Sequence, residues 1–265
     1  MKLAEQFYSS FGLIYNSLQG HTRNKVREPA AIRFAFPHHF VILSVMNLPT
    51  DKKQRYDRWD LFGNVHGKDK DMLIDLVRKN RSFRGYDHSR KISEEELLAM
   101  VEAARLCPSS VNMQPLKYYL AFREDTVNTI QKQTKWAKGL PEMTLPHEGK
   151  EPTAFIVICQ DTKINENLNR FHRDIGIVAH TILLTATEMG LGGCMIGNFD
   201  ANAVQGVLGL EENLRPMLIV AIGKPDEDVI LTDVVDGKTA YYRDEKDRHY
   251  VPKRALEDLV MGDHS

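Results

Sequence analysis

A long amphipathic segment, from about Arg173 to Met189, constrains the fold more than any other part of this sequence. Apolar side chains recur there at intervals of three and four residues, and Gly190 follows as a natural C-terminal helix cap. A helix with such a stripe must bury it against a core, so we predict that this helix is central. The stripe contains Ile175, Val178, Ala179, Ile182, Ala186 and Met189.

A second amphipathic helix is predicted from a capping box. Ser93 is followed by three glutamates, which is typical of a helix start, and Pro108 prevents the helix from continuing. Its inward-facing residues are expected to be Leu97, Met100, Val101 and Ala104.

A shorter helix is predicted before the second one. It should end near Asn80 and deliver Arg81 and Arg84 into the following turn. Its apolar face is expected to contain Met72, Leu73, Leu76 and Val77.

Four short apolar runs complete the pattern. They are 118–122, 155–159, 194–196 and 217–222. Apolar runs without polar alternation are typical of strands that are covered on both faces. With no internal repeat and no second core, the sequence predicts one α+β domain over residues 72–265, with a sheet between helical layers.

Residues 1–71 differ in character from the rest of the chain. No sustained helical or strand period runs through them. The apolar run 40–46 is too short to span a bilayer, and Glu5 falls where a signal peptide needs positive charge before an apolar stretch. We predict that 1–71 is a poorly ordered N-terminal extension or a misassigned start, and that the protein is cytoplasmic.

The composition limits the classes of function. With 35 basic and 36 acidic residues the formal net charge is −1, so no basic face for nucleic acid is implied. The mean hydropathy of −0.37 argues against a membrane protein. Cys107, Cys159 and Cys194 are widely spaced, which favours three reduced thiols over a metal site or a redox dithiol.

Two polar segments indicate a binding site. Arg81-Ser82-Phe83-Arg84 offers rigid guanidinium forks and a hydroxyl, which suit a phosphate. Pro108-Ser109-Ser110-Val111-Asn112-Met113-Gln114-Pro115 offers a flat apolar neighbour and amides that both donate and accept, which suit a heteroaromatic ring. Together the segments predict a site for a planar, phosphorylated cofactor.

Each segment alone has a plainer interpretation. Arg81 and Arg84 could be solvated residues at a helix end, where the dipole favours cations. The two serines after Pro108 could merely form a turn. Lys253 and Arg254 could begin a charged helix.

Both segments resemble signatures of the FMN-dependent nitroreductase family, which read R-S-x-R and P-S-S-x-N-x-Q-P. Downstream, 190–200 resembles the family's glycine-rich segment beside the flavin, and Val251-Pro252-Lys253-Arg254 resembles its basic C-terminal element. Four matches in order are more specific than any one of them. Asn80 departs from the pattern, because many relatives carry a second basic residue there.

The resemblance implies a three-layer α+β sandwich with a central, mostly antiparallel sheet between helices, assembled as a domain-crossing homodimer. It implies that FMN is bound across the interface, with Arg84 at the N1 and O2 edge of the ring, where a cation favours negative charge on the reduced ring. The residues expected at the phosphate are Arg81, Ser82, Lys253 and Arg254.

The resemblance also implies two further groups of contacts. Ile196, Gly197 and Asn198 would lie beside the ring, with backbone amides near the last two donating toward N5. The opposite subunit would supply Pro108, Ser109, Ser110, Asn112 and Gln114. No side chain need act as an acid or a nucleophile, because the cofactor carries the chemistry.

We therefore predict an FMN-dependent oxidoreductase that transfers hydride from NADH or NADPH through flavin N5 to nitroaromatic, quinone or similar acceptors by a ping-pong mechanism. Another flavin reaction on the same scaffold, reductive dehalogenation or flavin fragmentation, stays open, as does a non-enzymatic flavin-binding protein. Competing motifs fail, since Met195 replaces the third glycine of a dinucleotide fingerprint and Thr232 replaces the first glycine of a phosphate loop.

Overall fold

The computed structural model describes residues 33–36, 39–42 and 73–262. The chain divides into two units, with the boundary between Leu61 and Phe62. In the first unit, β1 (Arg33–Phe36) pairs antiparallel with β2 (His39–Ile42). Strands of four residues are too short to leave a sustained period in the sequence. The rest of the predicted extension, 1–71, lies outside the described residues.

A sheet of four antiparallel strands forms the centre of the second unit, in the order β3-β4-β6-β5. The strands are β3 (Leu116–Ala121), β4 (Ala154–Asp161), β5 (Gly192–Ile196) and β6 (Leu214–Gly223). They correspond to the four apolar runs of the sequence, so the predicted strands are confirmed. All residues of β4 except the last are buried, which explains its uninterrupted apolar character.

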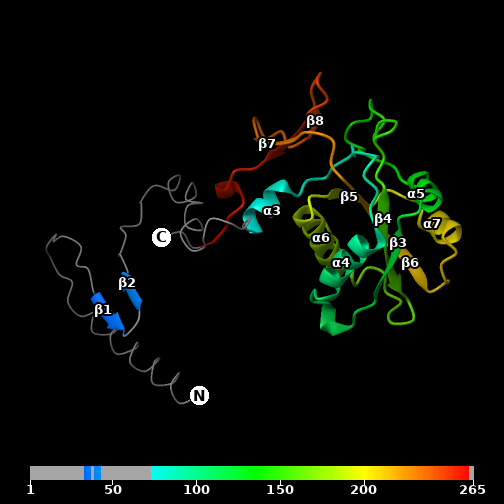
Figure 1. Ribbon diagram of the computed structural model, residues 1–265, viewed down its shortest axis with the longest axis horizontal. Coiled ribbons are helices and arrows are strands. Elements are labelled where there is room, and N and C mark those ends of the chain that lie inside the picture. The colour runs from blue at the N-terminus through cyan, green and yellow to red at the C-terminus, as the bar shows by residue number, and fades with distance from the viewer. Residues whose placement is uncertain (1–32, 37–38, 43–72, 263–265) are drawn as a thin grey trace, which may run out of the picture. The chain divides into compact units, whose positions relative to one another are not determined.

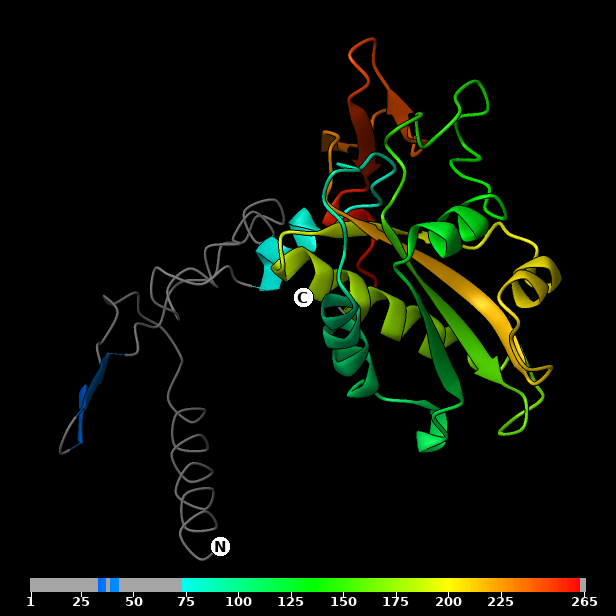
Figure 2. The ribbon, with the colours of Figure 1, turned by 45° about the vertical axis from the view of Figure 1, so that its right-hand side comes forward.

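Helices cover both faces of this sheet (Figures 1 and 2). Alternate residues of β4 face opposite layers: Ile156 and Ile158 pack into the core beneath α4 and α6, whereas Phe155 and Val157 pack into the core beneath α5 and α7. The predicted three-layer α+β sandwich is therefore confirmed. The helices are α4 (Glu94–Arg105), α5 (Glu124–Gln131), α6 (His172–Glu188) and α7 (Ala201–Val207).

The predicted helix ends are also found. The Ser93 hydroxyl accepts from the backbone N of Glu96, and the Glu96 carboxylate accepts from the backbone N of Ser93, which completes the capping box. After α6, Gly190 has φ +73°, the left-handed conformation of a C-terminal cap. Met189, expected in the apolar stripe, is instead 40% exposed because the helix ends one residue before it.

α3 (Leu73–Lys79) ends where the sequence predicts, directly before Asn80. None of its residues is buried within the chain, and Leu73 is among the most exposed of the large apolar side chains. The predicted apolar face of α3 is thus only partly covered by its own chain: Leu76 and Val77 are half-buried, whereas Leu73 is exposed.

The C-terminal part forms a small sheet that the sequence analysis did not predict. β7 (Val229–Asp233) pairs parallel with β9 (His249–Lys253), and β9 pairs antiparallel with β8 (Tyr242–Arg243). A 3₁₀ turn, η3 (Leu256–Asp258), follows. Lys253 therefore ends a strand and does not begin a helix. Among the described residues, no helix has the length and apolar content needed to cross a bilayer.

Two glycines let the Arg81–Arg84 segment lie against β5. Ser82 forms a parallel bridge with Gly193, and the backbone N of Phe83 donates to the Gly193 carbonyl (3.0 Å). A Cβ on Gly192 would lie 2.6 Å from the Phe83 ring, and a Cβ on Gly193 would lie 2.0 Å from the Ala221 carbonyl oxygen. The glycine-rich segment is therefore required for close packing of three neighbouring backbones.

We expect Gly193→Ala to lower the free energy of unfolding by about 3 kcal/mol or more, because backbone atoms of β6 cannot move away from the new methyl group. The matched control is Gly176→Ala, at an open position on the exposed face of α6, which should be neutral or stabilising by up to about 1 kcal/mol. Urea denaturation of both variants measures the difference. Equal effects would show that the packing at Gly193 is not restrictive.

Candidate functional site

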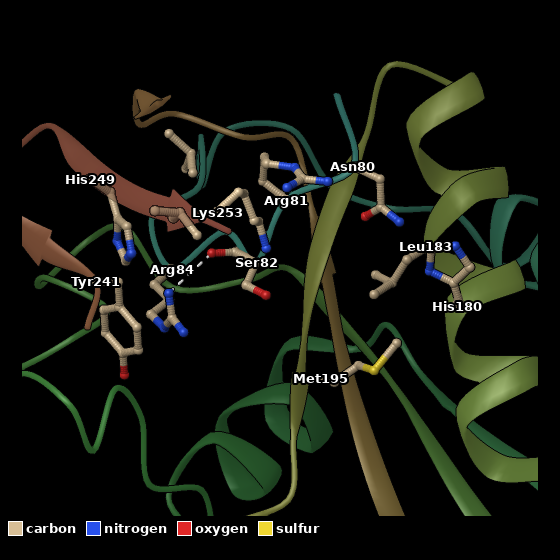
Figure 3. A pocket seen from close by; sticks show the side chains of 12 residues that line it. Asn80, Arg81, Ser82, Arg84, His180, Leu183, Met195, Tyr241, His249 and Lys253 are labelled. Atoms are coloured by element: carbon tan, nitrogen blue, oxygen red, sulfur yellow. Dashed lines mark hydrogen bonds between the residues drawn. The ribbon is translucent and has the colours of Figure 1, made fainter. Parts of the chain in front are cut away.

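A cavity of about 400 Å³ lies between the C-terminal sheet and α6, with β5 at its floor (Figure 3). Its walls come from segments that are far apart in the sequence. Those segments contribute Arg81, Ser82, Arg84, His180, Met195, Tyr241, His249 and Lys253, among others. No residue that lines the cavity carries a carboxylate. The cavity is therefore positively charged and has no countercharge of its own.

Arg81 is held at the end of α3. Its Nη2 donates to the Val77 carbonyl (2.5 Å), so it caps the helix as the plainer interpretation of the sequence suggested. Its Nε is buried and has no hydrogen-bond partner within the described chain. Burial lowers the pKa of the Arg81 guanidinium from its ordinary value. An anion in the cavity would satisfy this donor and compensate for the lost hydration.

Arg84 is oriented by two neighbours. Its Nη1 donates to the Ser82 carbonyl (3.2 Å), and its guanidinium lies 5.0 Å from the centroid of the Tyr241 ring, a cation–π contact. It forms no ion pair with a carboxylate of the described residues. Its backbone N donates to Glu227, but that carboxylate is paired with Arg243, and both side chains are buried. The charge of Arg84 thus stays available to the cavity.

His249 and Tyr241 belong to the site although no sequence pattern singled them out. His249 is 1% exposed, and its ring stacks on Tyr241 at 5.2 Å between centroids. Its Nδ1 is buried without a partner. Burial, and then the charges of Arg84 and Arg243, lower the pKa of His249 to about 4, so the imidazole is neutral at pH 7. His249 reaches the cavity at the start of β9, and Tyr241 directly precedes β8; both strands are too short to be found in the sequence.

The predicted glycine-rich residues line a second, smaller cavity that shares Arg84 with the first. The Ile196 side chain is buried in the core, so only its backbone can face a ligand. Gly197 is exposed, and a Cβ there would meet nothing within 4 Å. Asn198 is exposed beside it. There is open space at this position for a ligand to approach the backbone.

The proline–serine segment lies elsewhere in the chain. Pro108, Ser109 and Gln114 line a separate cavity of about 380 Å³ beside Asp174. The Ser109 hydroxyl donates to the buried Asp174 carboxylate (2.6 Å) and accepts from the backbone N of Gln114 (3.0 Å). The backbone N of Ser110 donates to the same carboxylate oxygen of Asp174 (2.9 Å). Within one chain, this cavity is separate from the cavity lined by Arg81, Arg84 and Lys253, which we call the arginine cavity.

The outer part of that segment is an exposed turn. Val111 is 75% exposed with φ +47°, and Asn112 and Gln114 also have positive φ, which is unfavourable for residues other than glycine. The Gln114 amide donates to the Asn112 side chain (3.0 Å). Asp174 holds the base of this turn, so the two amides project from an anchored segment. Arg254, in contrast, is exposed and does not line the arginine cavity.

The residues present fit a phosphorylated planar group. Arg81, Arg84 and Lys253 provide the cations, Ser82 provides a hydroxyl, and the buried Arg81 Nε lacks an acceptor. No cluster of three or more possible metal ligands occurs among the described residues. The three cysteines are free, and burial raises the pKa of the Cys194 thiol, which makes it unreactive.

Comparisons with known proteins identify the family. The model of the nitroreductase family matches residues 77–224. An oxygen-insensitive NADPH nitroreductase of Helicobacter acinonychis is 25% identical over 187 residues, which cover 56% of this chain and 85% of that protein.

Two solved structures have the same fold and cover a larger share of this chain. An FMN-dependent nitroreductase of Clostridium difficile has a TM-score of 0.52 at 22% identity, covering 73% of this chain and 100% of its own. A nitroreductase of Desulfovibrio desulfuricans, solved in complex with FMN, has a TM-score of 0.55 at 19% identity, covering 74% and 99%. At these identities the two structures establish the fold.

A double-mutant cycle tests the anchoring of the exposed turn. We expect Ser109→Ala and Asp174→Asn to be coupled by about 0.5–3 kcal/mol in the free energy of unfolding, because they share a buried hydrogen bond. Ser110→Ala is the matched control, since Ser110 contacts Asp174 through its backbone and its hydroxyl makes no hydrogen bond within the described chain. If Ser110→Ala and Ser109→Ala show the same coupling energy with Asp174→Asn, the Ser109 hydroxyl does not anchor the turn.

His249 predicts a specific pH dependence. Its pKa in the folded protein, about 4, lies below its ordinary value of 6.5, so folding favours the neutral ring. This contribution is fully present above pH 6.5 and is lost as the pH falls toward 4. We expect His249→Asn to flatten the loss of thermal stability across this window, whereas His172→Asn, at an exposed position, should not. Parallel Tm profiles for wild type and His249→Asn would refute the argument.

Proposed function

Because the chain belongs to the nitroreductase family, we propose that it is an FMN-dependent oxidoreductase that uses NADH or NADPH, with its cofactor in the arginine cavity. The observation that carries this proposal is the convergence of Arg81, Arg84 and Lys253 on one cavity that has no carboxylate. A phosphate, and a ring that gains negative charge on reduction, are the ligands that such a cavity favours. The relatives named for FMN and for NADPH support the choice.

The phosphate end is assigned to Arg81, Ser82 and Lys253. The unpartnered Nε of Arg81 gives a fixed donor, and Lys253, at the end of β9, adds a flexible charge. Arg254 is adjacent and exposed, and it stays a proposed second contact. We further propose that residues 72–265 form the cofactor-binding unit on their own, since every residue of the cavity lies within them.

The ring is assigned to the region of Arg84. FMN held there would supply the redox chemistry, the transfer of hydride from NADH or NADPH to an acceptor. Arg84 stabilises the negative charge that reduction places on the ring, and the Tyr241 contact keeps its guanidinium in position. Gly197 and Asn198 line the adjoining cavity, and the open space at Gly197 lets a ring approach the backbone, so that a backbone amide there could donate to a ring nitrogen. The neutral His249 adds no charge to the site at pH 7.

A homodimer is proposed because the second signature lies at a separate cavity in its own chain. The exposed turn that carries Asn112 and Gln114 is anchored by Asp174 and points its amides away from its own core. In a domain-crossing dimer this turn would complete the cavity of the opposite subunit. The exposed apolar residues of α3 would gain a cover in such an assembly.

The acceptors proposed are nitroaromatics, quinones or similar compounds. Donor and acceptor must use the same open region beside Arg84 and Gly197, so the nicotinamide leaves before the acceptor binds, which is a ping-pong order. The decisive experiment is spectroscopic. The purified protein should show an oxidised flavin spectrum with FMN bound, and anaerobic NADH or NADPH should bleach it. A protein that binds no added FMN would refute the proposal.

Two substitutions separate the proposed roles. With FMN saturating, Arg84→Ala should slow reduction by NADH or NADPH by roughly ten- to a hundredfold, because one interaction with a charged group is lost near the reacting ring. Lys253→Ala should instead weaken FMN affinity and change reduction little. Stopped-flow absorbance measures both. Wild-type reduction by Arg84→Ala together with slowed reduction by Lys253→Ala would reverse the assignment.

A further inference from the structure

A second cavity, of about 170 Å³, adjoins the arginine cavity and shares Arg84, Met195 and Tyr241 with it. Whole ligand sites usually measure about 300–1,000 Å³, so this space suits one part of a ligand. Its outer wall is the loop 134–139, which follows α5. A ligand that lies over the proposed ring can therefore extend into this second cavity.

The loop is held in place at both ends. The backbone N of Lys135 donates to the Asn198 carbonyl (2.9 Å), and Thr134 forms a bridge with Phe199. At the other end, the backbone N of Gly139 donates to the Tyr241 hydroxyl (3.0 Å). A Cβ on Gly139 would lie 2.8 Å from that tyrosine, so the loop and Tyr241 are in close contact. The wall is a fixed part of the site.

The cavity has an apolar part and a charged part. Half-buried Trp136, oriented by a hydrogen bond from its Nε1 to the Thr134 hydroxyl (2.8 Å), lines it together with Met195. Lys135 and Lys138 also line it; both are exposed, and neither forms an ion pair with a described carboxylate. An aromatic group with an acidic substituent matches this combination.

The concentration of positive charge is local. The whole chain has one more acidic than basic residue, yet Arg84, Lys135 and Lys138 line this cavity and no carboxylate does. Arg81 and Lys253 are already assigned to the phosphate of the cofactor, and Arg84 to its ring. The two loop lysines have no such role, so their charge is left for another anion.

We propose that Lys135 and Lys138 form a substrate subsite for an anionic group, so that the preferred substrates carry a carboxylate, sulfonate or phosphate. This inference rests on the proposed function, because the substrate is the molecule that exchanges hydride beside Arg84. Two sources supply the same chemistry: an acidic aromatic acceptor, or the additional phosphate that distinguishes NADPH from NADH. The small volume of the second cavity and its apolar wall at Trp136 suit either the acidic group of an acceptor or the additional phosphate of NADPH.

The test compares matched acceptors in FMN-loaded, full-length protein. The double variant Lys135→Gln, Lys138→Gln should lower the preference for 4-nitrobenzoate over the neutral 4-nitrobenzamide, measured as the ratio of their kcat/KM values, by roughly fivefold or more. Lys132→Gln is the control, because Lys132 is exposed on the same segment but lines neither cavity. Charge reversal at both positions should enlarge the change.

A second arm identifies the source of the anion. With a neutral quinone as acceptor, the ratio of kcat/KM for NADPH to that for NADH is measured in the same variants. A fall in this ratio alone assigns the subsite to the donor phosphate, and a fall in the acceptor ratio assigns it to acidic acceptors. Equilibrium titration of the oxidised protein with 4-nitrobenzoate gives a readout that does not depend on turnover.

The proposal is overturned if the double variant shows the same two ratios and the same 4-nitrobenzoate affinity as Lys132→Gln. Flavin absorbance and its bleaching by NADH are recorded first for every variant. A wild-type protein without bound FMN would refute the proposed function, whereas a flavin-loaded protein without charge preference would refute only the subsite.

Discussion

The arrangement of the site depends on the contacts of one buried carboxylate, that of Glu227. Its buried carboxylate accepts from the backbone N of Arg84 and pairs with the buried guanidinium of Arg243, so it joins the arginine segment to the C-terminal sheet. A buried ion pair is costly unless its hydrogen bonds are satisfied. The backbone donor adds one to Glu227, and Arg243 also pairs with Asp247 (2.9 Å), although its Nε is buried without a partner among the described residues. Because the Glu227 charge is used by Arg243, the Arg84 guanidinium remains free to face the cavity. The same contact therefore fixes the position of Arg84 and preserves its charge.

The remainder of the site follows from close backbone packing. Gly192 leaves room for Phe83, so that the segment Arg81–Arg84 lies along β5 and its side chains reach the cavity, and Gly193 lets β5 lie close to β6. The result is a cavity lined by cations, in which the buried Arg81 Nε and the buried His249 Nδ1 have no hydrogen-bond partner among the described residues. No carboxylate lines this cavity, so its positive charge has no countercharge among the lining residues, and a phosphorylated cofactor would supply one. The loop with Lys135 and Lys138 extends the same electrostatic character toward the substrate.

Much of this could be predicted from the sequence. The helices of 93–105 and 172–188 and the four central strands were found because their apolar spacing reflects burial on one face or on both. The C-terminal sheet was missed because its strands are short and partly polar, so Tyr241 and His249 could not be placed at the cavity. Nor could the sequence show that Glu227 pairs with Arg243. The exposure of Met189 was mispredicted because the helix ends one residue earlier, and such boundaries depend on local hydrogen bonds.

The central claim is that FMN binds between an arginine cavity of one subunit and the anchored turn of the other. Hybrid dimers test it most directly. One chain carries Arg81→Ala and Lys253→Ala, the other carries Asn112→Ala and Gln114→Ala, and bound FMN is measured by absorbance for the hybrid and for both homodimers. If the site is shared, the hybrid contains one site with both halves intact, so it should bind one FMN per dimer while both homodimers bind weakly. A hybrid that binds FMN no better than the homodimers would contradict the account.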